Sequence, residues 1–373
     1  MKFSSLKDQS VMGKKVLLRV DFNVSLTQDH QVADDYRIKC TLPTIQKLLE
    51  QNNKIIILAH LGRPKEYDPH FSLKPVQERL QTYVPGYTVV LLNSPEEIKN
   101  HSWQEKEILM LENLRFFPGE KKNDPSFAQE LASLGDVYVN DAFGNCHRKH
   151  ASMTGIPKLL PSYAGLLLAK EVEMIERVTQ HSERPVVAIL GGAKVSTKMG
   201  LIEKFLSIAD SVLLGGGIAN TFLKARGVDI KNSLHEDSMV DLAKKLVTSS
   251  EGERRIVLPE DYRWGEDSIL DIGPETQKKW DAVIRSAKTI IWNGPVGYFE
   301  DERFRAGTIA VFDSIIQNTQ AVSVVGGGET VSAIIQRQGS DKITHISTGG
   351  GAMLEYIEKG SLPGIEALRS SKA

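Results

Sequence analysis

The sequence predicts an α/β protein that is built from two doubly wound parallel-sheet domains. The chain has 373 residues, which is too many for one ordinary hydrophobic core. Apolar, partly β-branched segments alternate with amphipathic helical patterns along both halves, as in parallel sheets with right-handed crossovers. Several apolar segments of the second half end directly in glycine runs, which indicates that their carboxyl ends converge on one crevice.

The first half is expected to alternate strands and helices in chain order. The predicted strands cover 15–20, 54–59, 88–92, 109–111 and 136–139. The predicted helices cover 35–51, 72–83 and 127–134. In the first of these helices, Ile38, Leu42 and Ile45 make one apolar stripe, which is typical of a helix that packs on a sheet.

Polar side chains follow these strands at the points where the strands end or near the start of the first helix. They are Asp21, Asn23, Arg37, His60, Arg63, Arg115, His147 and Arg148. A basic cluster on one edge allows a nearly neutral protein to hold a small polyanion, although each residue alone could equally form a surface ion pair. Asp21 and Asn23 are expected to supply hydrogen-bond acceptors, which suits a substrate that carries a hydroxyl group.

The second half begins after a segment with two prolines and a glycine at 157–165, which is the expected domain boundary. A helix at about 166–179 is expected to join the two domains. The predicted strands of this half cover 186–190, 212–214, 289–293, 322–325 and 343–348. The short apolar tail at 362–368 is expected to dock on the protein.

The residues that follow strand 186–190 form the strongest phosphate-binding pattern. Gly191 and Gly192 permit a sharp turn, and a helix is expected to begin directly after them with its backbone N–H groups pointing at a ligand. Lys194 and Lys198 would then lie on one face of the first turns, where the helix dipole disfavours cations unless an anion offsets them. A phosphate group would serve as that anion. The alternative is a set of tight strand–helix turns that bind nothing.

Composition excludes several classes of protein. The net charge of −1 argues against a nucleic-acid partner. No apolar run approaches the roughly 20 residues of a membrane span, and the first residues lead into no signal-peptide core. Two cysteines, Cys40 and Cys146, fit a reducing compartment better than a disulfide framework. These observations predict a cytoplasmic protein with small-molecule partners.

Other enzyme classes share parts of this pattern. Glycine runs after strands also occur in dinucleotide-dependent oxidoreductases, but none of these runs has the G-x-G-x-x-G spacing. The G-x-x-x-x-G-K-[ST] motif of Walker-type kinases does not occur either. Cys146 and His147 are neighbours in sequence, and adjacent residues rarely form a thiol-catalysis pair. A non-catalytic nucleotide-binding protein stays open as the alternative to an enzyme.

A series of segments over both halves resembles phosphoglycerate kinase. These are RVDFNV (19–24), DDYRIK (34–39), HLGRP (60–64), LENLRF (111–116), VNDAFG (139–144) with HR (147–148), LGGAKVSTK (190–198), GGGIANTFLK (215–224), WNGPVGYFE (292–300), VGGGET (325–330) and STGGGAMLE (347–355). The resemblance implies two domains that face each other across a cleft, are joined by a hinge helix and close for catalysis. The first, 1–160, would bind 3-phosphoglycerate or 1,3-bisphosphoglycerate, and the second, 161–360, would bind Mg-ADP or Mg-ATP. The tail, 361–373, would pack back on the first domain.

The same resemblance implies roles for individual residues. The implied substrate set is Asp21, Asn23, Arg37, His60, Arg63, Arg115, His147 and Arg148. The implied nucleotide set is Gly191, Ala193, Lys194, Lys198, Gly215, Gly216, Leu234, Leu270, Asn293, Pro295, Glu300, Gly327, Gly328, Glu329 and Thr330. Glu329 is implied as the Mg²⁺ ligand. The implied catalytic groups are Arg37, Lys194, Gly328 and Gly351.

The implied reaction is the reversible, in-line phosphoryl transfer of glycolysis and gluconeogenesis, carried out by a monomer. In the ATP-consuming direction the attacking group is a carboxylate, which is already ionised because its pKa is about 3.5–4. Catalysis then needs positioning and charge stabilisation and no general base. The sequence departs from the family at Glu329, where Asp is usual, and at 262–269, which is shorter than usual and leaves adenine selectivity open.

Overall fold

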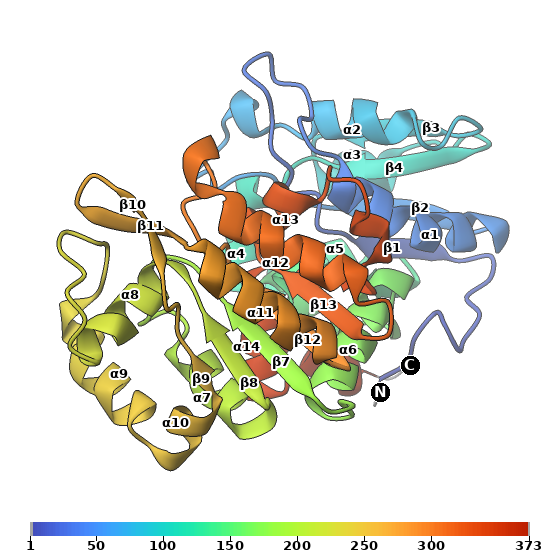
Figure 1. Cartoon of the computed structure of the whole chain (residues 1–373). Helices are drawn as coiled ribbons and strands as arrows, with labels where there is room; N and C mark the ends of the chain where they lie inside the picture. Colours follow the sequence, from blue (N-terminus) through green and yellow to red (C-terminus); the bar gives the residue numbers. More distant parts are fainter. Residues whose placement is uncertain (1–2, 372–373) are drawn as a thin grey trace. The chain divides into compact units, whose positions relative to one another are not determined.

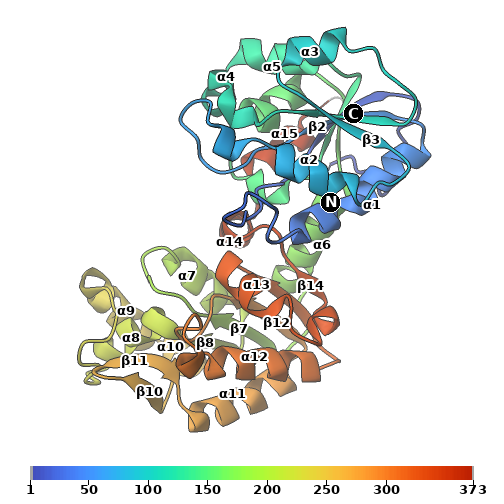
Figure 2. The same ribbon diagram turned by 90° about the horizontal axis from the view of Figure 1, so that it is seen from above.

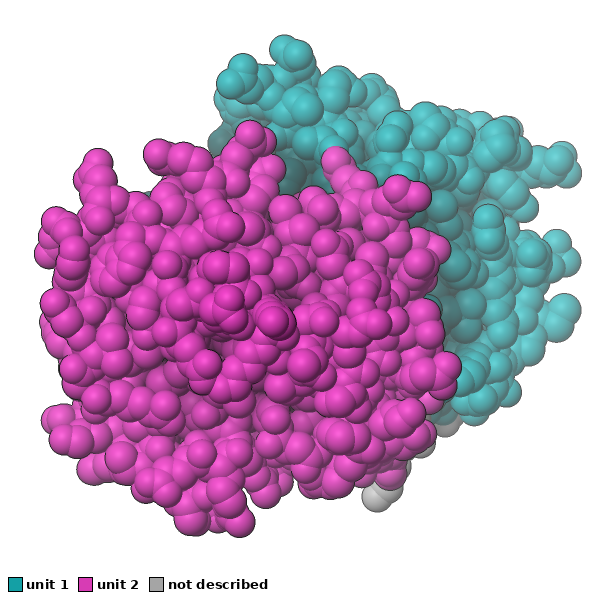
Figure 3. All heavy atoms as spheres, viewed as in Figure 1, with its two compact units in different colours: residues 1–173, 361–373 teal, residues 174–360 magenta. Residues whose placement is uncertain are grey.

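The structure is a computed structural model that describes residues 3–371. The chain divides into two compact units, shown in different colours in Figure 3. Unit 1 comprises residues 1–173 and 361–373, and unit 2 comprises residues 174–360. Helix α6 (Leu166–Thr179) contains this division, which therefore lies further along the chain than residue 160.

Unit 1 is organised around a six-stranded parallel sheet with the strand order β3-β4-β2-β1-β5-β6 (Figure 1). The strands are β1 (Lys15–Arg19), β2 (Lys54–Leu58), β3 (Thr88–Leu92), β4 (Glu107–Leu111), β5 (Val137–Asn140) and β6 (Ser162–Ala164). The five predicted strands are confirmed. Interpreting 157–165 only as a boundary is wrong for 162–164, because this short segment pairs in parallel with β5.

The helices of unit 1 cover both faces of this sheet. They are α1 (Tyr36–Glu50), α2 (Lys74–Gln81), α3 (Pro95–Asn100), α4 (Pro118–Lys122), α5 (Pro125–Ala132) and α15 (Pro363–Arg369), with a π-helical turn, η4 (Ala151–Gly155). Figure 2 shows α1 and α2 on one face and α3, α4 and α5 on the other. Val16 and Leu18 of β1 pack with Ile38 and Ile45 of α1, as the apolar stripe predicts.

Unit 2 contains a second six-stranded parallel sheet, with the order β14-β13-β12-β7-β8-β9. Its strands are β7 (Val186–Leu190), β8 (Ser211–Leu214), β9 (Ile256–Val257), β12 (Thr289–Asn293), β13 (Val322–Gly326) and β14 (His345–Ile346). An antiparallel hairpin of β10 (Tyr262–Gly265) and β11 (Ser268–Ile272) stands apart from this sheet (Figure 1). The shortened 262–269 segment thus lies in a two-stranded hairpin, whose register shifts between Arg263 and Trp264.

Helices also cover the second sheet. They are α7 (Met199–Ile208), α8 (Gly216–Ala225), α9 (Val240–Val247), α10 (Ser250–Arg255), α11 (Pro274–Ser286), α12 (Ala306–Gln317), α13 (Gly328–Ile334) and α14 (Gly351–Lys359). Trp280 and Ile284 of α11 and Phe312 of α12 pack in one cluster with Val187 and Ile189 of β7. The two parallel sheets confirm the predicted fold class.

Short 3-10 turns occur in both units. They are η1 (Pro69–Phe71), η2 (Leu114–Phe116), η3 (Phe143–Asn145), η5 (Ile156–Lys158), η6 (Asp237–Met239), η7 (Glu302–Phe304) and η8 (Ser340–Lys342).

The C-terminal helix α15 belongs to unit 1. Leu362, Ile365 and Leu368 are buried, and the Gly364 N–H donates to the Cys146 carbonyl at 2.8 Å. A Cβ atom at Gly364 would lie 3.1 Å from the Cys146 sulfur, so the helix approaches this part of unit 1 closely. Residues 372–373 of the tail lie outside the described residues. Among the helices of residues 3–371, none combines the length and apolar character that a membrane crossing requires.

Candidate functional site

In unit 1, the parallel register brings the ends of four strands to one level. Arg19, the last residue of β1, pairs with Leu58 of β2 and with Asn140 of β5, and Leu58 pairs in turn with Leu111 of β4. The residues that follow these strands therefore lie along one edge of the sheet. The order of the strands reverses between β1 and β5, and such switch points are where doubly wound sheets bind ligands.

Asp21 and Arg37 form an ion pair at this edge. Asp21 is 6% exposed, and its Oδ2 accepts from Arg37 Nη1. Burial alone would raise the pKa of the Asp21 carboxyl, but nearby positive charge, with Arg37 as its largest source, outweighs burial and leaves that pKa below its usual value. Asp21 is therefore an anion that holds Arg37 in place on the first turn of α1.

Asn23 already has a partner within the protein. Its Oδ1 accepts the Gly62 backbone N–H at 2.8 Å, which ties Asn23 to the loop after β2. This contact uses one of the two lone pairs of the amide oxygen, so the oxygen can still accept from a substrate hydroxyl. The amide NH₂ of Asn23 adds a donor to the same edge.

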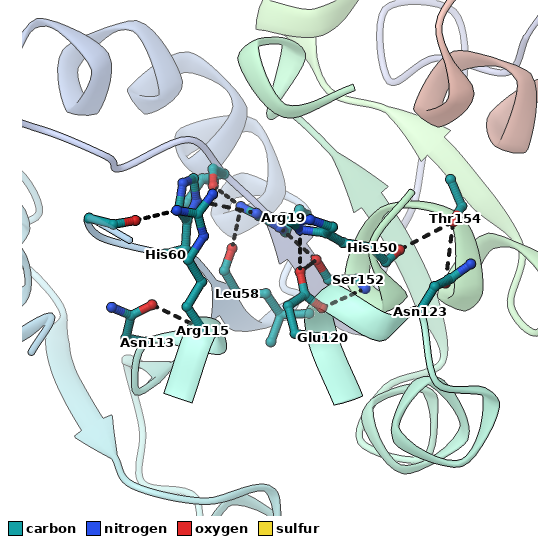
Figure 4. A network of polar contacts seen from close by, with 12 residues as sticks. Arg19, Leu58, His60, Asn113, Arg115, Glu120, Asn123, His150, Ser152 and Thr154 are labelled. Atoms are coloured by element: carbon teal, nitrogen blue, oxygen red, sulfur yellow. Dashed lines mark hydrogen bonds and ion pairs between the residues drawn. The ribbon is translucent and has the colours of Figure 1, made fainter. Parts of the chain in front are cut away.

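His60 and Arg115 lie in the same cluster (Figure 4). His60 is 4% exposed, and burial, followed by the charge of Arg19, lowers the pKa of its imidazole well below the usual value. Arg115 Nη1 donates to the Gly62 carbonyl. Burial, together with the neighbouring charges of Arg148, Arg19 and Arg63, lowers the pKa of the Arg115 guanidinium to about 10. Arg115 stays charged at neutral pH.

The remaining substrate-set residues complete the basic cluster. Arg63 is exposed in the loop after β2, and His147 and Arg148 are half-buried just after η3. The charges of Arg63 and Arg148 act on Arg115, so the three guanidinium groups lie near one another. The structure thus brings together most of the residues that the sequence singles out in this half of the chain, and His147 follows them directly after η3.

Sequence reasoning missed four residues that support this cluster. They are Arg19, Glu120, His150 and Ser152, and Figure 4 shows their contacts. Arg19 is 1% exposed and Glu120 is 1% exposed, so both charges are removed from water. One signal could have found Arg19, since an arginine that ends an apolar strand has to be paired if it is buried. Glu120 and Ser152 come from distant segments, and no local pattern marks them.

In unit 2, the corresponding edge is built mainly from backbone. Asn293, the last residue of β12, pairs with Leu190 of β7 and with Gly326 of β13, and Leu190 pairs with Leu214 of β8. Each of these strands continues into a glycine. The chain order reverses between β7 and β12, so Gly191 and Asn293 lie at the switch point of this sheet.

Lys198 and Asn293 form the polar centre of this edge. Lys198 Nζ donates to the Gly191 carbonyl at 2.8 Å and to Asn293 Oδ1 at 2.7 Å, and Asn293 Nδ2 donates to the Gly326 carbonyl at 2.9 Å. Burial lowers the pKa of the Lys198 ammonium to about 8, and Glu329 opposes this shift. The network therefore ties the loops that follow β7, β12 and β13 together through one cation.

The loop between Gly191 and α7 differs from the prediction. Helix α7 begins at Met199, so Lys194 and Lys198 precede the helix and do not lie on its first turns. Glu236 explains the difference, because its carboxylate accepts the Ser196 N–H at 2.8 Å and the Ser196 hydroxyl at 2.6 Å. These bonds hold the segment in a turn. Lys194 is exposed, and Ala193 beside it is exposed as well.

Close backbone approaches explain the glycines of this edge. A Cβ atom at Gly191 would lie 1.9 Å from the Pro295 carbonyl oxygen, and one at Gly215 would lie 2.5 Å from Val296 Cβ. Gly216 and Gly327 have φ values of 61° and 102°, which residues with a side chain rarely adopt. At Gly328 and Gly351, by contrast, no described atom lies within 4 Å of such a Cβ.

The start of α13 carries two further residues of the nucleotide set. The Thr330 hydroxyl, fully buried, accepts the Gly294 N–H at 2.7 Å. Glu329 is exposed in the first turn, where a carboxylate is favourable to the helix dipole. Thr330 therefore braces the Asn293–Pro295 turn, and Glu329 is left facing solvent.

The last three residues of the nucleotide set are Leu234, Leu270 and Glu300. Hydrogen bonds connect the segments that carry Leu234 and Leu270. Ser233 Oγ accepts the Ile269 N–H at 2.8 Å, which ties the loop of Leu234 to β11. The Leu270 carbonyl accepts the Tyr298 N–H at 2.7 Å. Leu234 and Tyr298 are 61% and 53% exposed, so each presents apolar atoms to solvent. Glu300 is exposed two residues beyond Tyr298.

The residues of unit 2 fit a metal ion that arrives with a nucleotide better than a resident one. Within residues 3–371, no group of three or more His, Cys, Asp or Glu side chains is placed to hold a metal ion. Glu329 offers a single carboxylate. Mg²⁺ is commonly held by one or two carboxylates together with substrate phosphates and waters, so this donor set suits it.

Two doubly wound α/β units, each with polar groups at the carboxyl ends of its strands, define a ligand-binding protein of the α/β class. Comparisons with known proteins identify the family. The family model described as phosphoglycerate kinase matches residues 6–360. The chain is 42% identical to the phosphoglycerate kinase of Finegoldia magna, with 99% of both chains covered, and 44% identical to that of Koribacter versatilis, with 98% of both covered.

Solved structures agree with these relatives. The phosphoglycerate kinase of Coxiella burnetii has a TM-score of 0.88 and 38% identity to this chain, and that of Pyrococcus horikoshii has a TM-score of 0.85 and 32% identity. Each comparison covers 98% of both chains. The chain belongs to the phosphoglycerate kinase family. This confirms the expected phosphotransferase with a carboxyl group as acceptor and does not favour a dinucleotide-dependent oxidoreductase or a non-catalytic relative.

Proposed function

We propose that this chain catalyses the reversible transfer of a phosphoryl group between 1,3-bisphosphoglycerate and Mg-ADP, which yields 3-phosphoglycerate and Mg-ATP. One observation carries the proposal: a chain of this family has a cation-lined strand edge in unit 1 and a glycine-lined strand edge in unit 2. Each edge suits one phosphate-bearing molecule, the first through guanidinium groups and the second through backbone amides.

In unit 1, the basic cluster would bind the phosphoglycerate. Arg63, Arg115 and Arg148 present guanidinium groups that pair with phosphate in a bidentate manner. His60 and the Asn23 amide supply neutral donors, and Asp21 supplies the acceptor for a substrate hydroxyl while it holds Arg37. His147 would lie at the margin of the same site.

In unit 2, the glycine loops would bind the nucleotide. The backbone of Gly191, Ala193, Gly215 and Gly216 and the Asn293–Pro295 turn would face the phosphates, with Lys194 and Lys198 as cations. Leu234 and Leu270 would contact the base, and Glu300 would accept from the ribose hydroxyls. Gly327, Gly328, Glu329 and Thr330 would lie at the terminal phosphates.

The chemistry requires little beyond positioning. The substrate carboxylate is ionised near neutral pH, because its pKa is about 3.5–4, and attacks the terminal phosphorus directly. Arg37 and Lys194 would stabilise the charge on the transferring group, and the amides of Gly328 and Gly351 would donate to its oxygens. Mg²⁺, held by Glu329 and the nucleotide phosphates, would neutralise phosphate charge when bound.

We further place the enzyme in the cytoplasm as a monomer whose partners are these small molecules and not nucleic acid. The nearly balanced charge of the chain supports the absence of a nucleic-acid partner. Sedimentation analysis of the purified chain at several concentrations tests the monomer, because a dimer would show a concentration-dependent mass.

A coupled spectrophotometric assay of ATP-dependent phosphorylation of 3-phosphoglycerate tests the reaction. The expected result is turnover that requires ATP, Mg²⁺ and 3-phosphoglycerate together. A chain that binds ATP but shows no turnover in either direction would instead be a non-catalytic relative. The Arg37→Ala variant is the control, since it removes a proposed catalytic cation and leaves the nucleotide set of unit 2 unchanged.

A further inference from the structure

A buried row of polar side chains lies behind the basic cluster of unit 1 and ends at His60 (Figure 4). It consists of Glu120, Ser152, Arg19 and His60, none of which is more than 4% exposed. Ser152 Oγ donates to Glu120 Oε1 at 2.7 Å, Arg19 Nε donates to Ser152 Oγ at 2.9 Å, and Arg19 Nη2 lies 3.4 Å from His60 Nδ1. The row links a carboxylate to the imidazole through one hydroxyl and one guanidinium.

The chemistry of the side chains fixes which group donates and which accepts at each contact of this row. Arginine has five N–H donors and no acceptor, so Arg19 donates at both of its contacts. Ser152 Oγ accepts from Arg19 and consequently gives its own proton to the carboxylate of Glu120. His60 Nδ1 accepts from Arg19 and therefore carries a lone pair, which leaves the single proton of the neutral ring on Nε2.

The other protonation states of His60 are disfavoured at this position. A proton on Nδ1 would point at the guanidinium, so that two donors would face each other at a buried position. A doubly protonated ring would add a second cation beside Arg19. Burial and the Arg19 charge both lower the pKa of His60, and only the Asp21 carboxylate among the main causes opposes them. A neutral ring is the favoured state.

Further contacts hold the row in place at Arg19 and at Glu120. Arg19 Nη1 donates to the Val20 carbonyl and lies 3.5 Å from that of Leu58. Glu120 accepts the Ser152 backbone N–H at 2.9 Å, and its Oε1 lies 3.5 Å from His150 Nδ1. A buried guanidinium requires a nearby anion, and Glu120 supplies it through the hydroxyl of Ser152. Removing one member would free its neighbours to move.

We propose that Glu120 and Ser152 are positioning residues that act through Arg19 to hold His60 as an Nε2–H donor toward the phosphoglycerate. They do not touch the substrate themselves. The inference rests on the proposed function in one respect, which is that His60 binds the substrate. The placement of the proton on His60 can be measured without substrate, so the two claims can be tested separately.

The Ser152→Ala variant removes the hydroxyl that joins Arg19 to Glu120. Thr154→Ala is a matched control, because the Thr154 hydroxyl lies in the same π-helical turn but contacts Asn123 and the His150 carbonyl, at 3.3 and 3.2 Å. The readout is the tautomer of His60, obtained by NMR from long-range ¹H–¹⁵N correlations of the ¹⁵N-histidine-labelled full chain. The His60 signal is assigned by its loss in the His60→Gln variant.

In the unsubstituted chain we expect a single neutral tautomer with the proton on Nε2 near neutral pH. Ser152→Ala should populate a second tautomer and raise the KM for 3-phosphoglycerate by about two- to tenfold, the usual worth of one hydrogen bond. The KM for ATP should stay constant, since the nucleotide set lies in unit 2. Thr154→Ala should leave the tautomer and both KM values unchanged.

A proton on His60 Nδ1, or an imidazolium, in the unsubstituted chain would overturn the proposal. So would equal changes in Ser152→Ala and Thr154→Ala. If Ser152→Ala does not fold, Arg19→Lys gives the same test, because lysine keeps the charge but cannot bridge Ser152 and His60 as a planar fork does. An unchanged KM for 3-phosphoglycerate in His60→Gln would overturn the proposed role of His60 in binding.

Discussion

The two units place their polar groups at the same position in the same kind of sheet but use different chemistry there. Unit 1 presents side chains, above all Arg37, Arg115 and His60, whereas unit 2 presents backbone around Gly191 and Gly216. Side chains can be exchanged one at a time, while backbone amides depend on the shape of the chain. The fold therefore fixes where a ligand binds and leaves open how it is bound.

The difference has an electrostatic consequence. The cations at the edge of unit 1 are matched by buried anions, with Asp21 beside the half-buried Arg37 and Glu120 linked to the buried Arg19. At the edge of unit 2 the half-buried cation Lys198 is held by a carbonyl and an amide oxygen and has a pKa lowered to about 8. An edge built from side chains needs compensating charge, and an edge built from backbone needs little.

Lys194→Ala is expected to have the largest effect. If charge stabilisation by this side chain dominates, kcat should fall by about 10²–10³-fold while nucleotide affinity changes less. Lys245, an exposed lysine of α9, provides the control Lys245→Ala, which should leave kcat unchanged. Steady-state kinetics in the ATP-consuming direction measures both. If kcat of Lys194→Ala stayed near that of the unsubstituted enzyme, the backbone of unit 2 alone would support transfer. The two units would then differ even more in how they use side chains.

Gly191→Ala tests the backbone of unit 2 directly. The added methyl group would meet the Pro295 carbonyl at 1.9 Å, so the loops after β7 and β12 must separate. We expect a loss of about 1–3 kcal/mol in unfolding free energy and a comparable loss in ADP binding. Gly86→Ala is the control, because no described atom lies within 4 Å of its Cβ. Equal stability of the two variants in urea unfolding would contradict the close approach.

The pH dependence of ADP binding tests Lys198, the half-buried cation at the strand edge of unit 2. Because burial lowers the pKa of Lys198 to about 8, its charge is present below that pH and is lost as pH rises through it. ADP affinity should fall by up to about tenfold between about pH 7 and about pH 9, since one pKa unit corresponds to a factor of ten. Calorimetric titration of the Lys198→Gln variant with ADP should show an affinity that does not change between these pH values. If ADP affinity fell with pH as steeply in that variant, a group other than Lys198 would be responsible for the pH dependence.

Glu329→Gln is expected to have the smallest effect. If this carboxylate contacts Mg²⁺ on the nucleotide, the metal concentration for half-maximal rate should rise several-fold, about the effect of losing one charged hydrogen bond or ligand contact. Mn²⁺ should still substitute for Mg²⁺. A lower Tm with unchanged metal dependence would show that Glu329 only complements the helix dipole of α13.

The sequence predicts the central strands well because runs such as β7 and β12 are continuous, apolar and buried along their whole length. The short or partly exposed strands β6, β9, β10 and β11 lack such a run and are not predicted. The sequence also predicts the residues that follow the central strands, since parallel strands bring their ends to one edge. The local backbone conformation of the loops is harder to predict from the sequence. Helix α7 begins at Met199 and not after Gly192, because Glu236, forty residues further on, captures the Ser196 amide and hydroxyl.

Residues whose role comes from distant partners were the ones that sequence reasoning missed. Glu120 belongs to the site only because Ser152 of a π-helical turn and Arg19 of β1 meet it in the core. The partner of Asn23 is distant as well, since the Gly62 amide that donates to its carbonyl comes from another loop. No spacing or periodicity encodes such contacts.

Helix α15 bears on how the chain is completed during synthesis. Unit 1 lacks its last segment until residues 361–371 are made, so a ribosome produces all of unit 2 before the helix that covers Cys146. Domains usually finish in the order in which they emerge. Here the first unit to begin is the last to acquire all its residues, and the face beside Cys146 stays uncovered on the nascent chain while unit 2 already has every residue it needs.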